Sequence, residues 1–521
     1  MSGDRFYAVL VRLSGWKLWA VAGLLGAIGS LAFAPIYMVP VLVPALTGLL
    51  LFCTSAASLR AAFIIGWWFG FGHFVAGFYW VGNSFVVADV GVFAGILAVA
   101  ALAATAALSI ALVGAVCNIA RLSGVSQVVL FASLWTLAEW GRSFFILGGF
   151  PWNLIGYVWG FSDNMIQLAA ATGVFGVSAV TVFCAASPVT LVRSEQPIAW
   201  RRWTWIGVAA VGLLAIWAGG ALRLSNVSLD VVEDVRLRIV QANITQHHKW
   251  LPDLREAHFA EHLMLTQVPA TQQITHVIWP ETATPYAVDW NPPIREMIGS
   301  ATPPEGLLIT GAISMSEKGE EPLRIWNSLH AISFAGDIVG SYNKMRLVPF
   351  GEYVPLRDWL PFAKLVHGSR DYSRGTGQRT LDLPGLPSVG PLICFEAIFP
   401  GDVIDESRRP EWLLNLTNDA WYGNSAGPYQ HLVQTKFRSV EEGLPLIRAA
   451  NTGISAAIDA HGRVVASLGL GETGVLDTEL PMPLIEATFY GQHGNIPIVL
   501  FVCLLVAVTL VGGAQRRTFG G

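Results

Sequence analysis

Long apolar runs alternate with short polar segments over the first 224 residues, and one more apolar run follows near the C-terminal end. A helix that crosses a bilayer needs about 20 apolar residues. Eight segments fit this length: about 16–34, 36–52, 60–81, 90–117, 126–145, 164–192, 203–222 and 493–513. The second is short and contains Pro40 and Pro44, and the fifth carries Glu139 and Arg142 near its end. The pattern predicts seven membrane spans before the central region and one after it.

The pattern changes between about 225 and 488, where apolar residues recur in short runs with the length of β-strands. These runs are 236–244, 275–283, 305–314, 327–334, 337–348, 388–398, 411–419, 445–459 and 464–480. Two further segments, 253–268 and 428–441, are expected to be helical. Strands and helices in this mixture predict a layered α/β domain with one core. The expected organisation is therefore a transmembrane domain at 1–224, an α/β domain at 225–488, and a last helix with a tail at 489–521.

Composition supports a membrane protein and narrows its partners. Hydrophobic residues make up 53% of the chain and charged residues 13%, whereas soluble domains have about 25% charged residues. The formal net charge is −4, and the sequence has no basic stripe. A nucleic-acid partner is therefore not expected.

The basic residues of the loops predict how the chain is oriented. One side of the predicted membrane domain carries Arg5, Arg12, Lys17, Arg60, Arg121, Arg193, Arg201, Arg202, Arg516 and Arg517. Because basic loops stay in the cytoplasm, both termini are expected there. The 225–488 domain is then outside, in the periplasm of a Gram-negative cell.

One cysteine stands apart from the other four. Cys53, Cys117, Cys184 and Cys503 lie in or beside apolar runs, whereas Cys394 follows a predicted strand in the α/β domain. This domain contains no second cysteine for a disulfide, although its expected compartment would permit one. Cys394 is therefore either a small buried residue or a nucleophile.

Two other polar residues also follow predicted strands. Glu281 follows "HVIWP" and Lys344 follows "IVGSYN". A carboxylate, an ammonium and a thiol suit thioester chemistry. The ammonium would lower the pKa of the thiol and hold an oxyanion, while the carboxylate would move the proton. Taken singly, a Glu or Lys at such a position is more often a solvated strand end.

The ordered motifs around these residues resemble the nitrilase superfamily, which uses a Glu-Lys-Cys triad on an αββα sandwich. They are "WPETA" at 279–283, "YNKMRLVPFGEYVP" at 342–355 and "LICFEAIFP" at 392–400. With seven spans before the domain and one after it, the chain resembles the apolipoprotein N-acyltransferase branch. This resemblance extends to "LAEWGR" (137–142), "GFPW" (149–152), "NLTNDAWYG" (415–423) and "RAANTGIS" (448–455). Phe395 departs from the pattern, because a Tyr is expected at this position in many members.

The resemblance implies a polytopic helical membrane domain of about eight helices joined to a nitrilase-like α/β sandwich. It also implies an acyltransferase of the bacterial inner membrane. The acyl chain of a phospholipid would pass through a Cys394 thioester to the α-amino group of a lipoprotein's N-terminal S-diacylglyceryl-cysteine. The residues themselves support only acyl transfer through a thioester beside a membrane. A membrane-tethered amidase acting on small amides stays an alternative, and a transporter is disfavoured because the spans are mostly uncharged.

Several further residues are candidates for supporting roles. By its place in the family motif, Glu352 would orient Lys344 and raise the pKa of that lysine; the alternative is a carboxylate at the surface or in a turn. Glu396 would either hold the loop after Cys394 or face solvent. Trp250 resembles a tryptophan near the family's site, although an ordinary packing role is also open.

Segment 354–368 combines apolar residues, among them Trp359 and Phe362, with basic ones. It is expected either to be an arm at the lipid interface or to pack in the core. Trp421 and Tyr422 could form a second arm. No cofactor is expected. Metal binding is not expected either, because the adjacent His247 and His248 would point apart and no third ligand has useful spacing. The chain is expected to act as a monomer.

Overall fold

The computed structural model describes residues 14–145, 148–192, 203–355, 357, 359, 364–366 and 370–519. The chain forms two compact units. One contains Met1–Gly82, Phe93–Asn226 and Phe489–Gly521, and the other contains Asn83–Val92 and Val227–Thr488. The short segment Asn83–Val92 thus groups with the α/β unit, although it is far from that unit in sequence.

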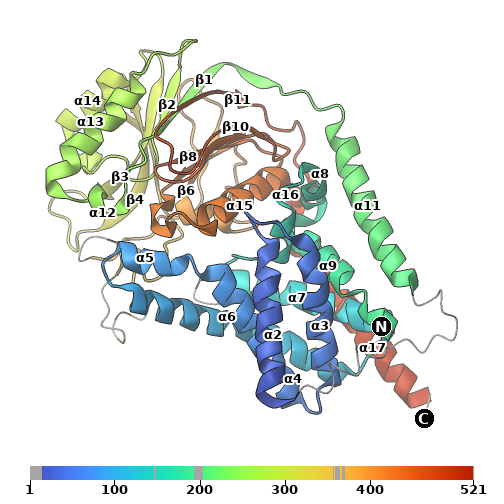
Figure 1. The fold of residues 1–521 in the computed structure, drawn as a ribbon. Coiled ribbons are helices and arrows are strands. Elements are labelled where there is room, and N and C mark those ends of the chain that lie inside the picture. Colours follow the sequence, from blue (N-terminus) through green and yellow to red (C-terminus); the bar gives the residue numbers. More distant parts are fainter. Residues whose placement is uncertain are drawn as a thin grey trace. The chain divides into compact units, whose positions relative to one another are not determined.

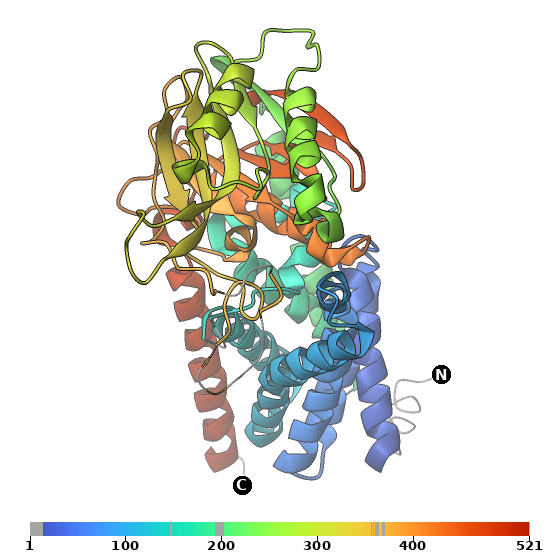
Figure 2. The ribbon, with the colours of Figure 1, turned by 90° about the vertical axis from the view of Figure 1, so that its left-hand side faces the viewer.

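The first unit is built from helices, and each of the eight segments predicted to span a membrane contains one. They are α2 (Gly15–Gly29), α3 (Leu42–Ser55), α4 (Leu59–Phe78), α6 (Val92–Ala120), α7 (Gly124–Phe144), α9 (Ala169–Ala186), α11 (Thr204–Leu224) and α17 (Ile496–Phe519). Shorter helices are η1 (Ser30–Ala32), η2 (Val39–Val41), η3 (Ile155–Trp159), α8 (Asp163–Ile166), α10 (Val189–Val192) and α16 (Phe489–His493). Helix α5 (Val81–Val87) begins in this unit, and its residues from Asn83 on are assigned to the second unit. In Figure 2 the C-terminal helix α17, drawn in red, runs as one straight helix, and it packs against α7.

Six helical segments of the described chain are long and apolar enough to cross a bilayer. These are Gly15–Ala32, Leu59–Phe78, Val92–Ala120, Ala169–Val192, Thr204–Leu224 and Ile496–Gln515. Val39–Ser55 is apolar but shorter, and α7 contains the charged residues Glu139 and Arg142. Length and hydropathy therefore support six of the eight expected spans.

Helices α2 and α4 approach each other closely because glycines line their contact. A Cβ atom on Gly26 would lie 2.0 Å from the carbonyl oxygen of Phe69. A Cβ on Gly72 would lie 1.9 Å from the carbonyl oxygen of Gly23. Small residues permit such backbone contact, which is the usual means of tight helix packing in membranes.

The second unit contains two β-sheets (Figure 1). The strands are β1 (Val231–Gln241), β2 (His276–Ile278), β3 (Leu307–Met315), β4 (Ile325–Ser333), β5 (Ile338–Asn343), β6 (Val389–Ile393), β7 (Trp412–Thr417), β8 (Leu446–Ala450), β9 (Ser455–Ile458), β10 (Val464–Leu468) and β11 (Gly474–Pro481). The six-stranded sheet has the order β11-β1-β2-β3-β4-β5, and the five-stranded sheet has the order β10-β9-β8-β7-β6. In each sheet three neighbouring strands are parallel, β1-β2-β3 in one and β6-β7-β8 in the other.

The two sheets share one core, and helices cover their outer faces. Buried side chains of both sheets, such as Leu329 of β4 and Leu414 of β7, form a single apolar cluster. Helices α13 (Arg255–Thr266) and α14 (Pro292–Ala301) pack on the six-stranded sheet through Phe259 and Ile298. Helix α15 (Ala426–Glu442) packs on the five-stranded sheet through Leu432. The layers are therefore helix, sheet, sheet, helix, as the αββα prediction requires.

Short helices complete this unit and lie next to the strand ends. They are α12 (Gln246–Lys249), η5 (Pro252–Leu254), η6 (Val288–Trp290), η7 (Cys394–Ile398) and η8 (Asp419–Tyr422). The predicted strand at 275–283 ends early, at Ile278. Pro280 has no N–H for a ladder bond, and Thr282 has a positive φ of 45°. The chain therefore turns at Glu281.

Candidate active site

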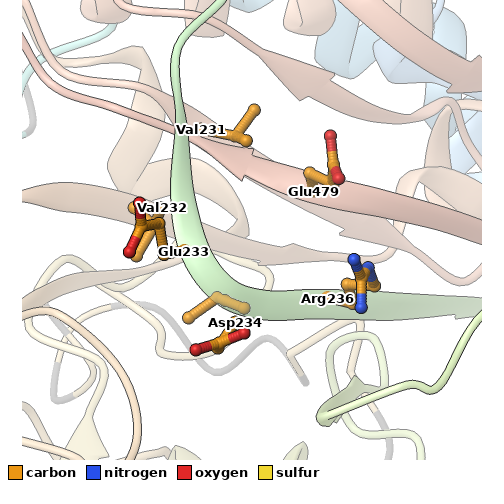
Figure 3. Close-up of a pocket in the computed structure, with 7 residues that line it drawn as sticks. Val231, Val232, Glu233, Asp234, Arg236 and Glu479 are labelled. Atoms are coloured by element: carbon orange, nitrogen blue, oxygen red, sulfur yellow. The ribbon is translucent and has the colours of Figure 1, made fainter.

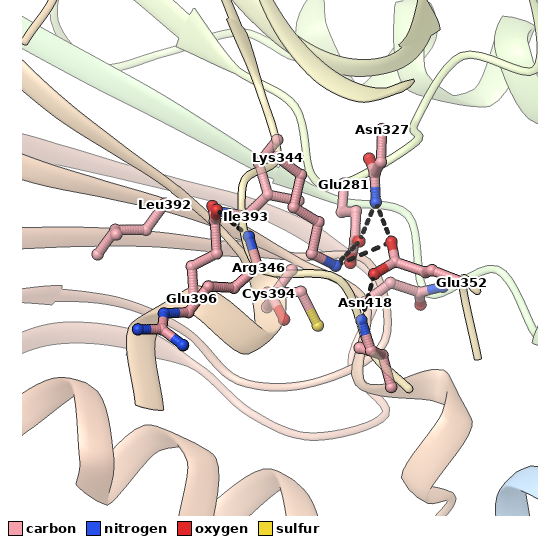
Figure 4. A network of polar contacts seen from close by, with 12 residues as sticks. Glu281, Asn327, Lys344, Arg346, Glu352, Leu392, Ile393, Cys394, Glu396 and Asn418 are labelled. Carbon is pink, nitrogen blue, oxygen red and sulfur yellow. Dashed lines mark hydrogen bonds and ion pairs between the residues drawn. The ribbon is translucent and has the colours of Figure 1, made fainter. Parts of the chain in front are cut away.

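The three residues of the predicted triad come from different strands of the two sheets. Glu281 follows β2 and Lys344 follows β5 in the six-stranded sheet, whereas Cys394 follows β6 in the five-stranded sheet. The three residues are 7%, 1% and 6% exposed, respectively. Figure 4 shows the Lys344 amine and the Cys394 thiol facing the same space, with the Glu281 carboxylate beside the amine.

The ammonium of Lys344 lies between two carboxylates. Its Nζ is 3.0 Å from Oε1 of Glu352 and 3.6 Å from Oε1 of Glu281. Burial alone would lower the pKa of Lys344, but Glu352 and then Glu281 raise it well above its ordinary value. Lys344 therefore stays charged. Glu352 thus raises the pKa of Lys344, as expected, and its role in orienting Lys344 stays a prediction.

Asn327 of β4 joins the same two carboxylates, and sequence reasoning did not identify it. Its Nδ2 donates to Oε1 of Glu281 at 2.7 Å and to Oε1 of Glu352 at 3.0 Å. Its backbone oxygen accepts from the N–H of Lys344 at 2.9 Å. The side-chain amide of Asn327 thus holds the two carboxylates in place, and its backbone carbonyl holds the backbone of Lys344. The sequence offers no signal for this role, because an Asn at the start of a strand is unremarkable in type and spacing.

The backbone of Glu281 crosses closely over β3. A Cβ on Gly311 would lie 2.5 Å from the N of Thr282 and 2.7 Å from the Cα of Glu281. Only glycine therefore fits beneath this turn. The carbonyl oxygen of Glu281 also accepts from Nζ of Lys249 at 3.0 Å. Burial lowers the pKa of Lys249 to about 8, against the smaller opposing effects of Glu281 and Cys394.

Cys394 sits at a sharp corner between β6 and η7. Its φ is +49°, in the left-handed region that costs a non-glycine residue roughly 1–2 kcal/mol. Burial raises the pKa of the Cys394 thiol to about 12, and Glu281 adds to this rise. Lys344 and a hydrogen bond with the Thr417 side chain act in the opposite direction.

The expected effect of Lys344, a lowering of the Cys394 pKa, is present, but burial outweighs it and the net pKa is raised. The lysine does favour the thiolate of Cys394, but removing a thiolate from water costs more than this one cation returns. The resting site holds a neutral thiol. Its proton must leave as the nucleophile attacks, which requires a base nearby.

Glu396 is fully buried, so it does not face solvent. Its Oε1 accepts from the N–H groups of Met345 and Arg346 at 2.7 and 3.1 Å, and from the Tyr342 hydroxyl at 2.8 Å. Its Oε2 accepts from the N–H of Ile393 at 2.7 Å. Burial raises the pKa of Glu396 to about 7, although these donors favour its charged form. The side chain thus ties the residues after Lys344 to the residue before Cys394.

The remaining candidates lie around this centre in different ways. Phe395 is buried and packs edge-to-face on Phe399, with ring centroids 5.1 Å apart. Trp250 directly follows α12, the helix that carries Lys249. Trp421 and Tyr422 end η8. Their carbonyl oxygens accept from Oγ of Ser84 at 3.1 Å and Nδ2 of Asn83 at 2.7 Å, respectively, so hydrogen bonds hold the backbone of the expected second arm.

The expected first arm, 354–368, lies only partly within the described residues. Trp359 is described and is 83% exposed. Leu356, Leu360 and Phe362 lie outside the described residues. The exposure of Trp359 is at odds with core packing of this one side chain. The interfacial role of the segment stays a prediction.

One pocket lies away from these residues (Figure 3). It follows a bend of β1, where the pairing register shifts and Asp234 has a φ of +58°. Its lining contains no Cys, Lys or His: Val231, Val232, Glu233, Asp234, Val235, Arg236 and Glu479. The described residues also include no group of three or more His, Cys, Asp or Glu side chains that could hold a metal ion.

Comparison with known proteins places the chain in a family. A family model for the apolipoprotein N-acyltransferase N-terminal domain matches residues 25–187, and one for carbon-nitrogen hydrolase matches residues 236–490. An apolipoprotein N-acyltransferase of Rhodopseudomonas palustris is 38% identical, over 98% of this chain and 97% of that protein. This chain belongs to the apolipoprotein N-acyltransferase family. A relative with the same name in Bradyrhizobium diazoefficiens is 39% identical over 96% of this chain and 96% of its own length. Another, in Rickettsia prowazekii, is 33% identical over 95% of this chain and 98% of its own length.

Among solved structures, an amidase from Nesterenkonia sp. matches 51% of this chain and 97% of its own, with 16% identity and a TM-score of 0.37. Membership of the apolipoprotein N-acyltransferase family confirms the predicted recognition and fold class, a helical membrane part joined to a nitrilase-like α/β domain. The family name and the apolar helices together identify an integral membrane protein.

Proposed function

We propose that this chain is an apolipoprotein N-acyltransferase. It would move an acyl chain from a phospholipid to the α-amino group of a lipoprotein's N-terminal S-diacylglyceryl-cysteine. One observation carries the proposal: a buried thiol, Cys394, faces an ammonium that two carboxylates hold, Glu281 and Glu352. This arrangement occurs in a chain that matches relatives of that name over nearly its full length.

In the first half-reaction the Cys394 sulfur attacks the ester carbonyl of a phospholipid. Because the resting thiol is neutral, Glu281 takes its proton as the carbon–sulfur bond forms. The oxyanion is held by the Lys344 ammonium and by backbone N–H groups beside Cys394. The intermediate then collapses, and the carbon–oxygen bond to glycerol breaks. Glu281 returns the proton to the leaving oxygen, and a lysophospholipid departs from the acyl-enzyme.

In the second half-reaction the neutral α-amine of the lipoprotein attacks the thioester carbonyl. The amine loses a proton to Glu281, the carbon–sulfur bond breaks, and the sulfur recovers a proton as the amide leaves. Water must stay away from the thioester during the exchange, because hydrolysis would release a fatty acid. The low exposure of Cys394, 6%, supports such exclusion.

The charge pattern of the loops supports an orientation in the bacterial inner membrane. Basic residues gather on the side that carries both termini, which favours cytoplasmic termini and a periplasmic α/β domain. The thiol would then act on the outer leaflet, where a lipoprotein that has crossed the membrane presents its amine. We propose that the chain acts as a monomer.

The competing function is a membrane-tethered amidase that uses water on small amides. The two functions differ in their products. Purified protein with a phospholipid and a synthetic S-diacylglyceryl-cysteine peptide is expected to yield a triacylated peptide, measured by mass spectrometry. Ammonia released from small amides, with no triacylated peptide, would support the amidase.

Omitting the acceptor peptide should trap the first half-reaction. An added acyl mass is expected on the peptide that contains Cys394, and the Cys394→Ala variant should show neither this mass nor transfer. Full transfer by Cys394→Ala would overturn the proposal. Because Cys53 and Cys117 are buried in the helical unit, they serve as internal controls that should carry no acyl mass.

A further inference from the structure

A buried histidine contacts the backbone of the nucleophile, and the mechanism above does not use it. His431 of α15 is 0% exposed, and its Nε2 lies 3.2 Å from the carbonyl oxygen of Cys394. A carbonyl oxygen only accepts hydrogen bonds. With the single hydrogen of the neutral ring assigned to Nε2, this nitrogen donates to the Cys394 carbonyl, and Nδ1 accepts from Nη2 of Arg448 at 3.1 Å.

The histidine ring is itself held by a buried ionic network. Its Nδ1 lies 2.9 Å from Oδ1 of Asp419, and Oδ2 of the same carboxylate accepts from Arg448 at 2.7 Å. Arg448 of β8 is fully buried, and its Nε also donates to the carbonyl oxygen of Ile454 at 3.2 Å. Oδ1 of Asp419 further accepts from the hydroxyl of Thr417 at 3.1 Å. The ring thus has a fixed position between β7, β8 and η8.

The contact falls on the peptide that matters most for an oxyanion. Because a trans peptide is planar, its C=O and N–H point in opposite directions. Fixing the carbonyl of Cys394 therefore fixes the direction of the Phe395 N–H as well. It also restrains Cys394 at its left-handed φ of +49°, a conformation that persists only where neighbours hold it.

We infer that His431 is a positioning residue for acyl transfer: through its hydrogen bond to the Cys394 carbonyl, it locks the peptide after the nucleophile in the orientation that serves the oxyanion. This inference deepens the proposed function and depends on it. The alternative is a core histidine that stabilises Asp419 and Arg448 without any effect on chemistry. Both readings predict some loss of stability on substitution, so stability alone does not separate them.

Two substitutions distinguish the contacts of Nε2 from those of Nδ1. In His431→Gln the side-chain amide reaches the place of Nε2, so it keeps a donor for the Cys394 carbonyl. In His431→Asn the amide reaches only the place of Nδ1, so it keeps polar contacts with Asp419 and Arg448 and loses the contact with Cys394. The inference predicts that Gln preserves acylation and that Asn does not. A role confined to Asp419 and Arg448 predicts the opposite order.

The measurement is the burst of p-nitrophenol when the full-length protein, in detergent micelles, is mixed with a p-nitrophenyl fatty-acid ester. This burst reports acylation of Cys394 before any acceptor arrives. For His431→Asn the burst rate constant at saturating ester is expected to fall by about ten- to a hundredfold, the usual effect of losing one such hydrogen bond. The ester concentration at half-saturation should stay unchanged. His431→Gln should remain within about threefold of the wild type.

Alkylation by iodoacetamide provides the readout that a structural defect would change. This reaction at Cys394 forms no oxyanion, so its rate, read on the Cys394 peptide by mass spectrometry, should stay within about threefold in both variants. A collapsed site would alter alkylation and acylation together, which would overturn the inference. Equal acylation in all three proteins, or slower acylation in Gln than in Asn, would also overturn it.

Two other outcomes are separable. If the wild type gives no burst, the proposed function fails, whatever the variants do. If His431→Asn yields no folded protein, His431→Gln carries the test alone. Wild-type acylation by this variant then supports the inference, and a tenfold or larger loss refutes it.

Discussion

Asn327 offers the sharpest test of the buried ion cluster. Replacing Asn327 with Leu keeps the volume of the side chain and removes its two hydrogen bonds, which reach Glu281 at 2.7 Å and Glu352 at 3.0 Å. A hydrogen bond to a charged group contributes about 1.5–3 kcal/mol. Lys344 still contacts both carboxylates, so the loss should be nearer to one bond than to two. A loss of about 2 kcal/mol in transition-state stabilisation lowers kcat/KM about thirtyfold.

Asn327→Asp should have a larger effect that depends on pH. It places a third carboxylate beside Glu281 and Glu352, with Lys344 as their shared cation. Like charges at this distance favour uptake of a proton. The deficit of this variant relative to the wild type is therefore expected to be larger at pH 8 than at pH 6. The assay is transfer of a radiolabelled acyl chain to a diacylated peptide between these two pH values.

Ser328 provides the matched control because it is the next residue on β4, and successive strand residues face opposite sides. Ser328 is 0% exposed, and its Oγ donates to Oδ1 of Asn343 at 2.6 Å. Ser328→Ala should cost about 1 kcal/mol of stability and leave kcat/KM within about twofold. If Ser328→Ala lost as much activity as Asn327→Leu, activity would follow the stability of β4, and the reasoning would be refuted.

Three further predictions concern other buried groups. Glu396→Gln puts an NH2 group among N–H donors and should lower stability by about 2 kcal/mol; a melting temperature equal to the wild type would contradict this. Unfolded Lys249 keeps its proton up to about pH 10.5, so burial of its charge costs stability below pH 8. The wild type therefore gains stability as pH rises from 8 towards 10.5, whereas Lys249→Met has no group that titrates at this position. In urea titrations the free energy of unfolding of Lys249→Met, relative to the wild type, should fall over this window. Gly26→Val should lower the melting temperature in detergent, because its Cβ would meet Phe69, whereas Gly212→Val, with open space around its Cβ, should not.

Much of the fold could be predicted because hydrophobic periodicity is a local property of the chain. All nine predicted strand segments contain strands, and both predicted helices of the α/β unit are present as α13 and α15. Helix α14 was missed although Ile294, Met297 and Ile298 have helical spacing. It is short and begins with two prolines, which suggest a loop when read alone.

The site was less predictable because its chemistry depends on distant contacts. Glu281, Lys344 and Cys394 could be identified from the motifs around them, yet Asn327 and His431 carry no such signal. Their roles arise only when β4 and α15 bring them to the two strand ends. The sequence also did not predict that the pKa of Cys394 is raised, because the effect of burial exceeds that of the nearby Lys344.

The division of the triad between two sheets has a further consequence. Glu281 and Lys344 belong to one sheet and Cys394 to the other, and the apolar cluster that joins the sheets includes Cys394 itself. The positions of Glu281 and Lys344 relative to Cys394 therefore depend on how side chains pack between the two sheets. Pressure, or truncation of an inner residue such as Leu414, would let one layer slide over the other and separate acid–base group from nucleophile. Turnover should then fall while the strands stay folded. The apolar core between the sheets therefore contributes to catalysis, as do the charged groups of the site.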